Sequence, residues 1–132
     1  MSYHLFLDDF REPKDVLAYF QPEELRYIYE HPEWVIVRDY NEFVDCIRSN
    51  GIPLVISFDH DLALEHYDPA MNESDEAYNE LIEKGIFKEK TGYHCALWFK
   101  EYMEQTGFPM PDIYCHSMNP VGKRNILKVF GK

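Results

Sequence analysis

Short apolar segments alternate with helical patterns along this chain, and the alternation limits the folds open to it. The segments cover residues 4–7, 34–37, 54–58 and 113–115, and the third is the most continuously apolar. An uninterrupted apolar strand is typical of the centre of a parallel sheet, where both faces are buried. Helices between such strands indicate βαβ units with right-handed crossovers. The sequence therefore predicts a three-layer α/β sandwich around a mostly parallel, four-stranded sheet.

Capping residues place the helices between these strands. Asn, Ser and Thr side chains accept hydrogen bonds from the free amides of a first helical turn, and proline fits that turn because it has no amide hydrogen. A helix is predicted to begin near each of six residues: Pro13, Pro22, Asn41, Ser74, Thr91 and Asn119. The helices that follow Asn41 and Thr91 are expected to stop at Gly51 and Gly107.

A polar insertion, residues 62–90, follows the third strand and interrupts the alternation. Within it, one helical pattern runs from Ser74 to Gly85. Long loops beside an active face often act as lids or contact the substrate, but an insertion without a function fits the sequence equally well.

The composition indicates one folded domain spanning residues 1–132, with 45% apolar and 16% aromatic residues. No apolar run approaches the roughly 18 residues of a membrane span. The first residues lack a basic region before an apolar one, so no secretory signal is expected. Cys46, Cys95 and Cys115 have no paired spacing, which favours reduced thiols over disulfides or a zinc site. These features predict a cytoplasmic protein with no membrane partner.

The net charge of −11 disfavours generic binding to duplex nucleic acid. Residues 119–132 differ from the rest, because they contain four basic side chains and no acidic one. A basic segment next to acidic residues suits a metal-assisted phosphate site. The structural alternative is that these charges simply favour the C-terminal end of a helix.

Polar residues follow three of the predicted strands. Asp8 and Asp9 follow the first, Asp59 and Asp61 stand directly after the third, and His116 follows the fourth. Ligands in open α/β sheets bind at the carboxyl ends of strands, so these groups are expected to converge. Four carboxylates together suit Mg²⁺ or Mn²⁺, which prefer oxygen ligands. The alternative is that an aspartate here only caps a turn or a helix.

His116 and His60 are candidates for acid and base catalysis, because imidazole titrates near neutral pH. Strand alternation places His60 opposite Asp59 and Asp61, so a packed core histidine is an equal alternative for His60. Ser117 is suited to hydrogen-bond a phosphate oxygen. As a nucleophile it is a weak candidate, because no Gly-x-Ser-x-Gly motif surrounds it.

Two predicted helix starts are candidates for ligand binding. At the last helix, free amides with Lys123 and Arg124 form a potential anion site, although Asn119 is also explained as a cap alone. At the long helix, Thr91 is most simply a cap, whereas Gly92 would let a ligand approach the backbone closely.

Taken together, these motifs resemble the cyclic-phosphate processing receiver-like domains, which are derived relatives of the response-regulator receiver. The resemblance covers nearly the whole chain. It implies a receiver-like strand order, with Asp8 and Asp9 as the acidic metal-binding pair, Asp59 at the phosphoacceptor position and Ser117 near the receiver hydroxyl. The residues that carry it are Leu7-Asp8-Asp9 with Arg11 and Pro13, Phe58-Asp59-His60-Asp61-Leu62, Thr91-Gly92, and His116-Ser117 with Asn119-Pro120, Gly122 and Asn125.

One departure from the receiver pattern bears on function. A receiver has a fifth strand that ends in a lysine, and no such strand is predicted here; Lys123 would have to substitute for that lysine. Signalling by phosphotransfer is therefore less favoured, while His60, Asp61, His116 and Asn119 are additional groups suited to hydrolysis. The resemblance implies processing of a cyclic phosphate, such as a 2′,3′-cyclic RNA end in RNA repair or a cyclic nucleotide.

The leading hypothesis is a metal-dependent phosphoesterase, a hydrolase. Asp8, Asp9, Asp59 and Asp61 would hold Mg²⁺ or Mn²⁺. His116 would protonate the leaving oxygen, with His60 as a second acid or base. The phosphate would be bound by Ser117, Asn119, Lys123, Arg124, Arg11 and Thr91. Two alternatives stay open: a receiver-type phosphoacceptor with Asp59 as the acceptor, and a non-catalytic acidic binding module.

Overall fold

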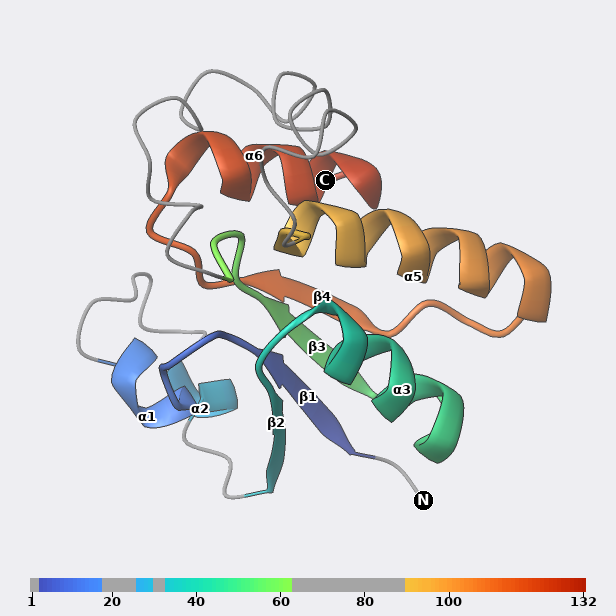
Figure 1. Cartoon of the computed structure of the whole chain (residues 1–132), viewed down its shortest axis with the longest axis horizontal. Helices are drawn as coiled ribbons and strands as arrows, with labels where there is room; N and C mark the ends of the chain where they lie inside the picture. The colour runs from blue at the N-terminus through green and yellow to red at the C-terminus, as the bar shows by residue number, and fades with distance from the viewer. Residues whose placement is uncertain (1–2, 18–25, 30–32, 63–89) are drawn as a thin grey trace.

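The computed structural model describes residues 3–17, 26–29, 33–62 and 90–132 (Figure 1). The position of Pro22 and the helix expected after Ser74 lie outside these residues, as does most of the 62–90 insertion.

The described strands form one parallel sheet. They are β1 (His4–Leu7), β2 (Trp34–Val37), β3 (Val55–Phe58) and β4 (Asp112–Cys115), in the order β2-β1-β3-β4. Leu7 is in register with Val37 and Phe58, and Phe58 is in register with Cys115. All four strands therefore end at one level, and the residues that follow them share one edge. This confirms the predicted receiver-like, flavodoxin-type α/β fold.

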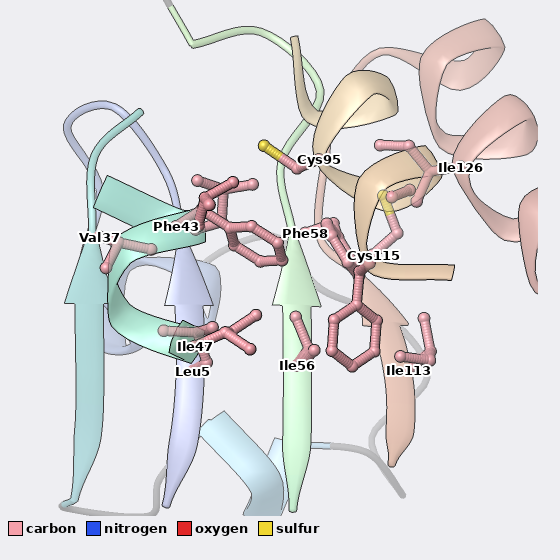
Figure 2. Packing of buried hydrophobic residues seen from close by; sticks show 14 of the residues in the cluster. Leu5, Val37, Phe43, Ile47, Ile56, Phe58, Cys95, Ile113, Cys115 and Ile126 are labelled. Carbon is pink, nitrogen blue, oxygen red and sulfur yellow. The ribbon is translucent and has the colours of Figure 1, made fainter. Parts of the chain in front are cut away.

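Helices cover both faces of the sheet (Figure 1). One face carries α3 (Tyr40–Asn50), α5 (Gly92–Thr106) and α6 (Pro120–Val129), and the other carries α1 (Pro13–Val16) and α2 (Arg26–Tyr29). The larger core lies on the first face, as Figure 2 shows. Its strand and helix residues include Leu5, Ile56, Phe58, Ile113, Phe43, Ile47, Cys95 and Ile126.

A smaller core of Phe6, Val16 and Tyr29 lies on the second face. Successive strand residues point to opposite faces, so Leu5 and Leu7 enter the larger core while Phe6 enters the smaller one.

The starts of α1, α5 and α6 agree with the sequence, whereas the start of α3 does not. Asn119 caps α6, Pro120 is its first residue, and Thr91 is the N-cap of α5. For α3 the expected cap, Asn41, is wrong: Asp39 accepts a hydrogen bond from the amide of Glu42 at 2.8 Å. Asp39, which lies two residues after the end of β2 and two residues before Asn41, therefore caps the helix in place of Asn41.

The described part of the chain contains no helix long and apolar enough to cross a membrane. Cys46, Cys95 and Cys115 are all free thiols.

Candidate functional site

The carboxyl ends of β1, β3 and β4 bring Asp8, Asp59 and His116 together. One ligand atom from each of the three side chains lies within 4.8 Å of the others, and all three residues are buried. The parallel register of the sheet produces this group, because each residue directly follows a strand that ends at the same level.

Asp8 is held by hydrogen-bond donors on both carboxylate oxygens. Its Oδ1 accepts from the backbone amides of Phe10 and Arg11, at 3.0 and 2.8 Å. Its Oδ2 lies 2.9 Å from His116 Nε2 and 3.5 Å from Arg11 Nη1. Burial acts to raise the pKa of Asp8, but the hydrogen bonds from His116 and the two amides outweigh it and lower the pKa to about 2. Asp8 is therefore ionised at neutral pH.

Asp59 and Asp9 each have a buried carboxylate oxygen that lacks a hydrogen-bond partner among the described residues. These oxygens are Asp59 Oδ2 and Asp9 Oδ1. Burial, followed by the charge of Asp8, raises the pKa of Asp59 to about 8 and that of Asp9 to about 6. A buried carboxylate oxygen without a hydrogen bond is stabilised when it binds a proton or a cation. The carboxylate oxygens gathered here therefore fit a hard divalent ion as ligands.

His116 is enclosed on the second face of the sheet. Its Nδ1 lies 2.6 Å from Ser57 Oγ, which lies 2.8 Å from the hydroxyl of Tyr29. Phe6 stacks on the imidazole with 4.3 Å between ring centroids. Burial lowers the pKa of His116, and the hydrogen bond to Asp8 opposes this shift only in part. The Nε2 of this buried ring faces Asp8, not open solvent.

His60 and Asp61 form a pair next to this group. His60 Nδ1 lies 2.9 Å from Asp61 Oδ1, and His60 is only 3% exposed. The ring packs beneath Gly122 of α6, where a Cβ atom would overlap it. His60 thus lies in a packed contact, and in the described chain neither Asp61 nor Asp9 belongs to the 4.8 Å group.

The turn between β4 and α6 orders the expected phosphate-binding residues. Asn119 Oδ1 accepts from the amide of Gly122 at 3.0 Å, and the Asn119 amide donates to Ser117 Oγ at 3.1 Å. Lys123 is half-buried, and its charge helps to lower the pKa of His116. Arg124 is exposed, and none of the described contacts joins it to the acidic residues.

The start of α5 supports the loop after β3. The buried Thr91 hydroxyl lies 3.0 Å from His94 Nδ1, in a capping box. The Gly92 amide donates to the His60 carbonyl at 2.8 Å, and a Cβ on Gly92 would overlap the Asp59 carbonyl oxygen. The lack of a side chain on Gly92 therefore lets the Asp59 backbone approach α5 closely. The sequence suggested that a ligand would approach there.

Comparison with known proteins agrees with this arrangement. The profile of the family described as the cyclic-phosphate processing receiver domain matches residues 3–132. The chain belongs to this family. No curated protein and no solved structure gives a match. The family description points to a phosphate-containing ligand for the site.

Several residues that shape the site of this receiver domain were not found from the sequence. Arg38 Nη1 donates to the carbonyls of Asp8 and Arg11, at 3.1 and 2.7 Å, and so fixes the loop after β1. Ser57 carried a weak signal, because it is a polar residue within an apolar strand. Tyr29 carried none, since its contact with Ser57 depends on how α2 packs on the sheet.

Proposed function

We propose that this receiver domain is a metal-dependent phosphoesterase that hydrolyses a cyclic phosphate at the carboxyl ends of β1, β3 and β4. The observation that carries the proposal is the buried Asp59 Oδ2, which has no hydrogen-bond partner among the described residues and lies beside the ionised Asp8. Neighbouring buried carboxylates repel each other, and a divalent cation relieves both the repulsion and the missing hydrogen bond.

Mg²⁺ or Mn²⁺ would be held by Asp8 and Asp59, with Asp9 and Asp61 as further oxygen donors. Such an ion, when bound, supplies positive charge that polarises a phosphoryl group and makes water easier to deprotonate.

Basic side chains on two sides of the acidic group would bind the phosphate oxygens. The Arg11 guanidinium lies 3.5 Å from Asp8 Oδ2 and also contacts Met118 Sδ at 3.6 Å, so it bridges the loops after β1 and β4. Lys123 projects from the first turn of α6. Ser117 and Asn119 hold that turn in place. Arg124 would contact a more distant part of the ligand. Thr91 would support the site indirectly, because it caps the start of α5.

The reaction adds water to phosphorus and breaks one ring P–O bond, which yields a phosphate monoester and a hydroxyl group. The leaving oxygen needs a proton. We assign its delivery to the His60–Asp61 pair, in which Nδ1 lies 2.9 Å from Oδ1 next to the acidic group. His116, which the sequence favoured, is the second candidate, because its buried Nε2 faces Asp8 and not solvent. Suitable substrates are 2′,3′-cyclic phosphate ends of RNA and cyclic nucleotides.

The proposal is tested by incubating the full chain with a 2′,3′-cyclic nucleotide and following monoester formation by ³¹P NMR. We expect turnover with Mn²⁺ and none with EDTA. Asp59→Asn should abolish it, whereas Asp45→Asn, which changes an exposed carboxylate on α3, should not. Equal turnover with and without metal, or none under either condition, would refute the proposal.

A receiver-type phosphoacceptor is the second candidate, because Asp59 directly follows β3 in a sheet of receiver-like order. Incubation with acetyl phosphate and intact-mass measurement separates the two functions. A phosphoryl adduct that is absent from Asp59→Asn, without turnover of the cyclic nucleotide, would favour the acceptor. Absence of both activities would favour the remaining hypothesis, a non-catalytic acidic binding module.

A further inference from the structure

We propose that Tyr29 and Ser57 are positioning residues of this site, which hold the His116 ring in the orientation that donates to Asp8 and thereby keep the Asp8 carboxylate in place. Neither residue belongs to the strand-end motifs. They act from α2 and from the middle of the sheet, on the face opposite the larger core. Their effect on turnover rests on the proposed function, whereas their effect on the orientation of the His116 ring does not.

The direction of each hydrogen bond follows from the chemistry of the four groups. Asp8 Oδ1 accepts from two backbone amides and Oδ2 faces the Arg11 guanidinium, so Oδ2 is an acceptor and His116 Nε2 carries the hydrogen that it donates. A neutral imidazole has one donor and one acceptor nitrogen, so Nδ1 accepts from the Ser57 hydroxyl. The Ser57 oxygen is then free to accept from the hydroxyl of Tyr29. Donation runs from Tyr29 through Ser57 and His116 to Asp8.

Packing keeps the imidazole in this orientation. Phe6 stacks on the ring with an interplanar angle of 9°, and the Tyr29 ring meets it edge-on at 6.3 Å between centroids. Ser57 is fully buried, and its small side chain leaves room for the imidazole to extend from β4 towards β1. Rotation of the ring by half a turn would exchange nitrogen for carbon next to both Ser57 and Asp8, and both hydrogen bonds would be lost.

The opposite tautomer would be unfavourable at this site. With the hydrogen on Nδ1, the bare Nε2 would face the Asp8 carboxylate, and two acceptors would meet in a buried place. The Ser57 hydroxyl, itself supported by Tyr29, disfavours this state because it supplies a donor to Nδ1. Hydrogen bonds of this kind behind a ligating carboxylate commonly set its orientation.

The tautomer is read directly from long-range ¹H–¹⁵N NMR spectra of the histidine-labelled full chain in EDTA. We expect the Nε2–H pattern for His116 in the wild type, with an Nε2 proton that exchanges slowly with solvent because the ring is held against Asp8. Ser57→Ala should speed this exchange. Ser57→Thr, which keeps the hydroxyl, should restore slow exchange, and Tyr29→Phe should speed it to a smaller degree. Tyr3→Phe is the matched control, because it removes a hydroxyl bonded to the Gly51 carbonyl away from the site. Near-UV circular dichroism verifies the fold of each variant.

With a cyclic nucleotide and Mn²⁺, Ser57→Ala should lower kcat about tenfold while KM is unchanged, and Ser57→Thr should recover it. Slow exchange of the Nε2 proton in both Ser57→Ala and Tyr29→Phe would overturn the inference. If the wild type shows no turnover but the exchange of the Nε2 proton changes as described, the phosphoesterase proposal fails and the positioning role of Ser57 and Tyr29 stands.

Discussion

Asp8 and Asp59 show how the surroundings of a side chain decide its chemistry. Both are buried aspartates at the ends of neighbouring strands. Asp8 receives amide, imidazole and guanidinium donors, whereas Asp59 Oδ2 has no partner among the described residues. As a result, the pKa of Asp8 falls to about 2 and that of Asp59 rises to about 8. Carboxyl pKa values pushed apart in this way are typical of functional sites.

The two aspartates should respond oppositely to conversion into asparagine. Asp8→Asn places an amide NH₂ or a neutral oxygen before His116 and should lower the free energy of unfolding by about 2–3 kcal/mol. Asp59→Asn removes a poorly solvated charge and should raise that free energy in EDTA at about pH 9, where the native Asp59 is ionised. Urea denaturation in EDTA measures both changes. A loss of stability in both variants would contradict the contrast between these sites.

The elements were largely predictable from the sequence because each depends on a local pattern. The four apolar segments became β1 to β4, and Asn119 with Pro120 began α6 as expected. The contacts that were not predictable join residues far apart in the chain. The hydrogen bond from Ser57 to His116 and the packing of His60 beneath Gly122 exist only once β3, β4 and α6 have assembled.

The close approach of α5 and α6 to the loop after β3 leads to a prediction about their first turns. Gly122→Ala would press a methyl group into the His60 ring, at a cost of about 1–3 kcal/mol in unfolding free energy. His60→Ala should relieve this overlap, so the double variant should lose less than the sum of the single losses. Gly92→Ala overlaps the Asp59 backbone instead, and His60→Ala should not rescue it. Additive losses for Gly122 and His60 in thermal unfolding would refute this packing.

The start of α6 is expected to contribute both to stability and to anion binding. Asn119→Ala removes the hydrogen bond to the Gly122 amide and should lower the unfolding free energy by about 1 kcal/mol. Asp39→Ala removes the equivalent cap of α3 and should cost a similar amount. Calorimetric titration with inorganic phosphate and Mn²⁺ should then show weaker binding only for Asn119→Ala. Equal phosphate affinity in the two variants would leave Asn119 as a cap alone.

At the scale of the whole molecule, the sheet gathers buried titratable side chains at one edge. Asp8, Asp59 and His116 lie there, and the charge of Lys123 acts on His116 from the first turn of α6. The remainder of the sheet is covered by apolar cores on both faces. The free energy of unfolding of the chain should therefore depend on the ionisation of a few strand-end groups.

Stability of the metal-free chain should fall as the pH rises from about 4 to about 8. Asp59 and Asp9 have folded pKa values raised to about 8 and about 6, above the ordinary value of 3.8. The unfolded chain therefore releases these protons first, and the native state is progressively disfavoured up to the folded pKa. Asp8 acts in the opposite sense, since its folded pKa of about 2 adds stability that is lost as the pH falls below about 4. The lowered pKa of His116 also opposes the fall in stability below about pH 6.5, but this one group is outweighed by the two carboxyls.

Added Mn²⁺ should change this profile, because the cation competes with protons for the same carboxylates. We expect the melting temperature to rise more at about pH 8 than at about pH 5, where Asp59 holds its proton. Asp59→Asn should flatten the pH dependence in EDTA and remove most of the response to Mn²⁺, whereas Asp45→Asn should preserve both. Differential scanning calorimetry at the two pH values measures these effects. A wild-type profile in EDTA that rises with pH between 4 and 8 would mean that the buried carboxyls are not protonated in the native state.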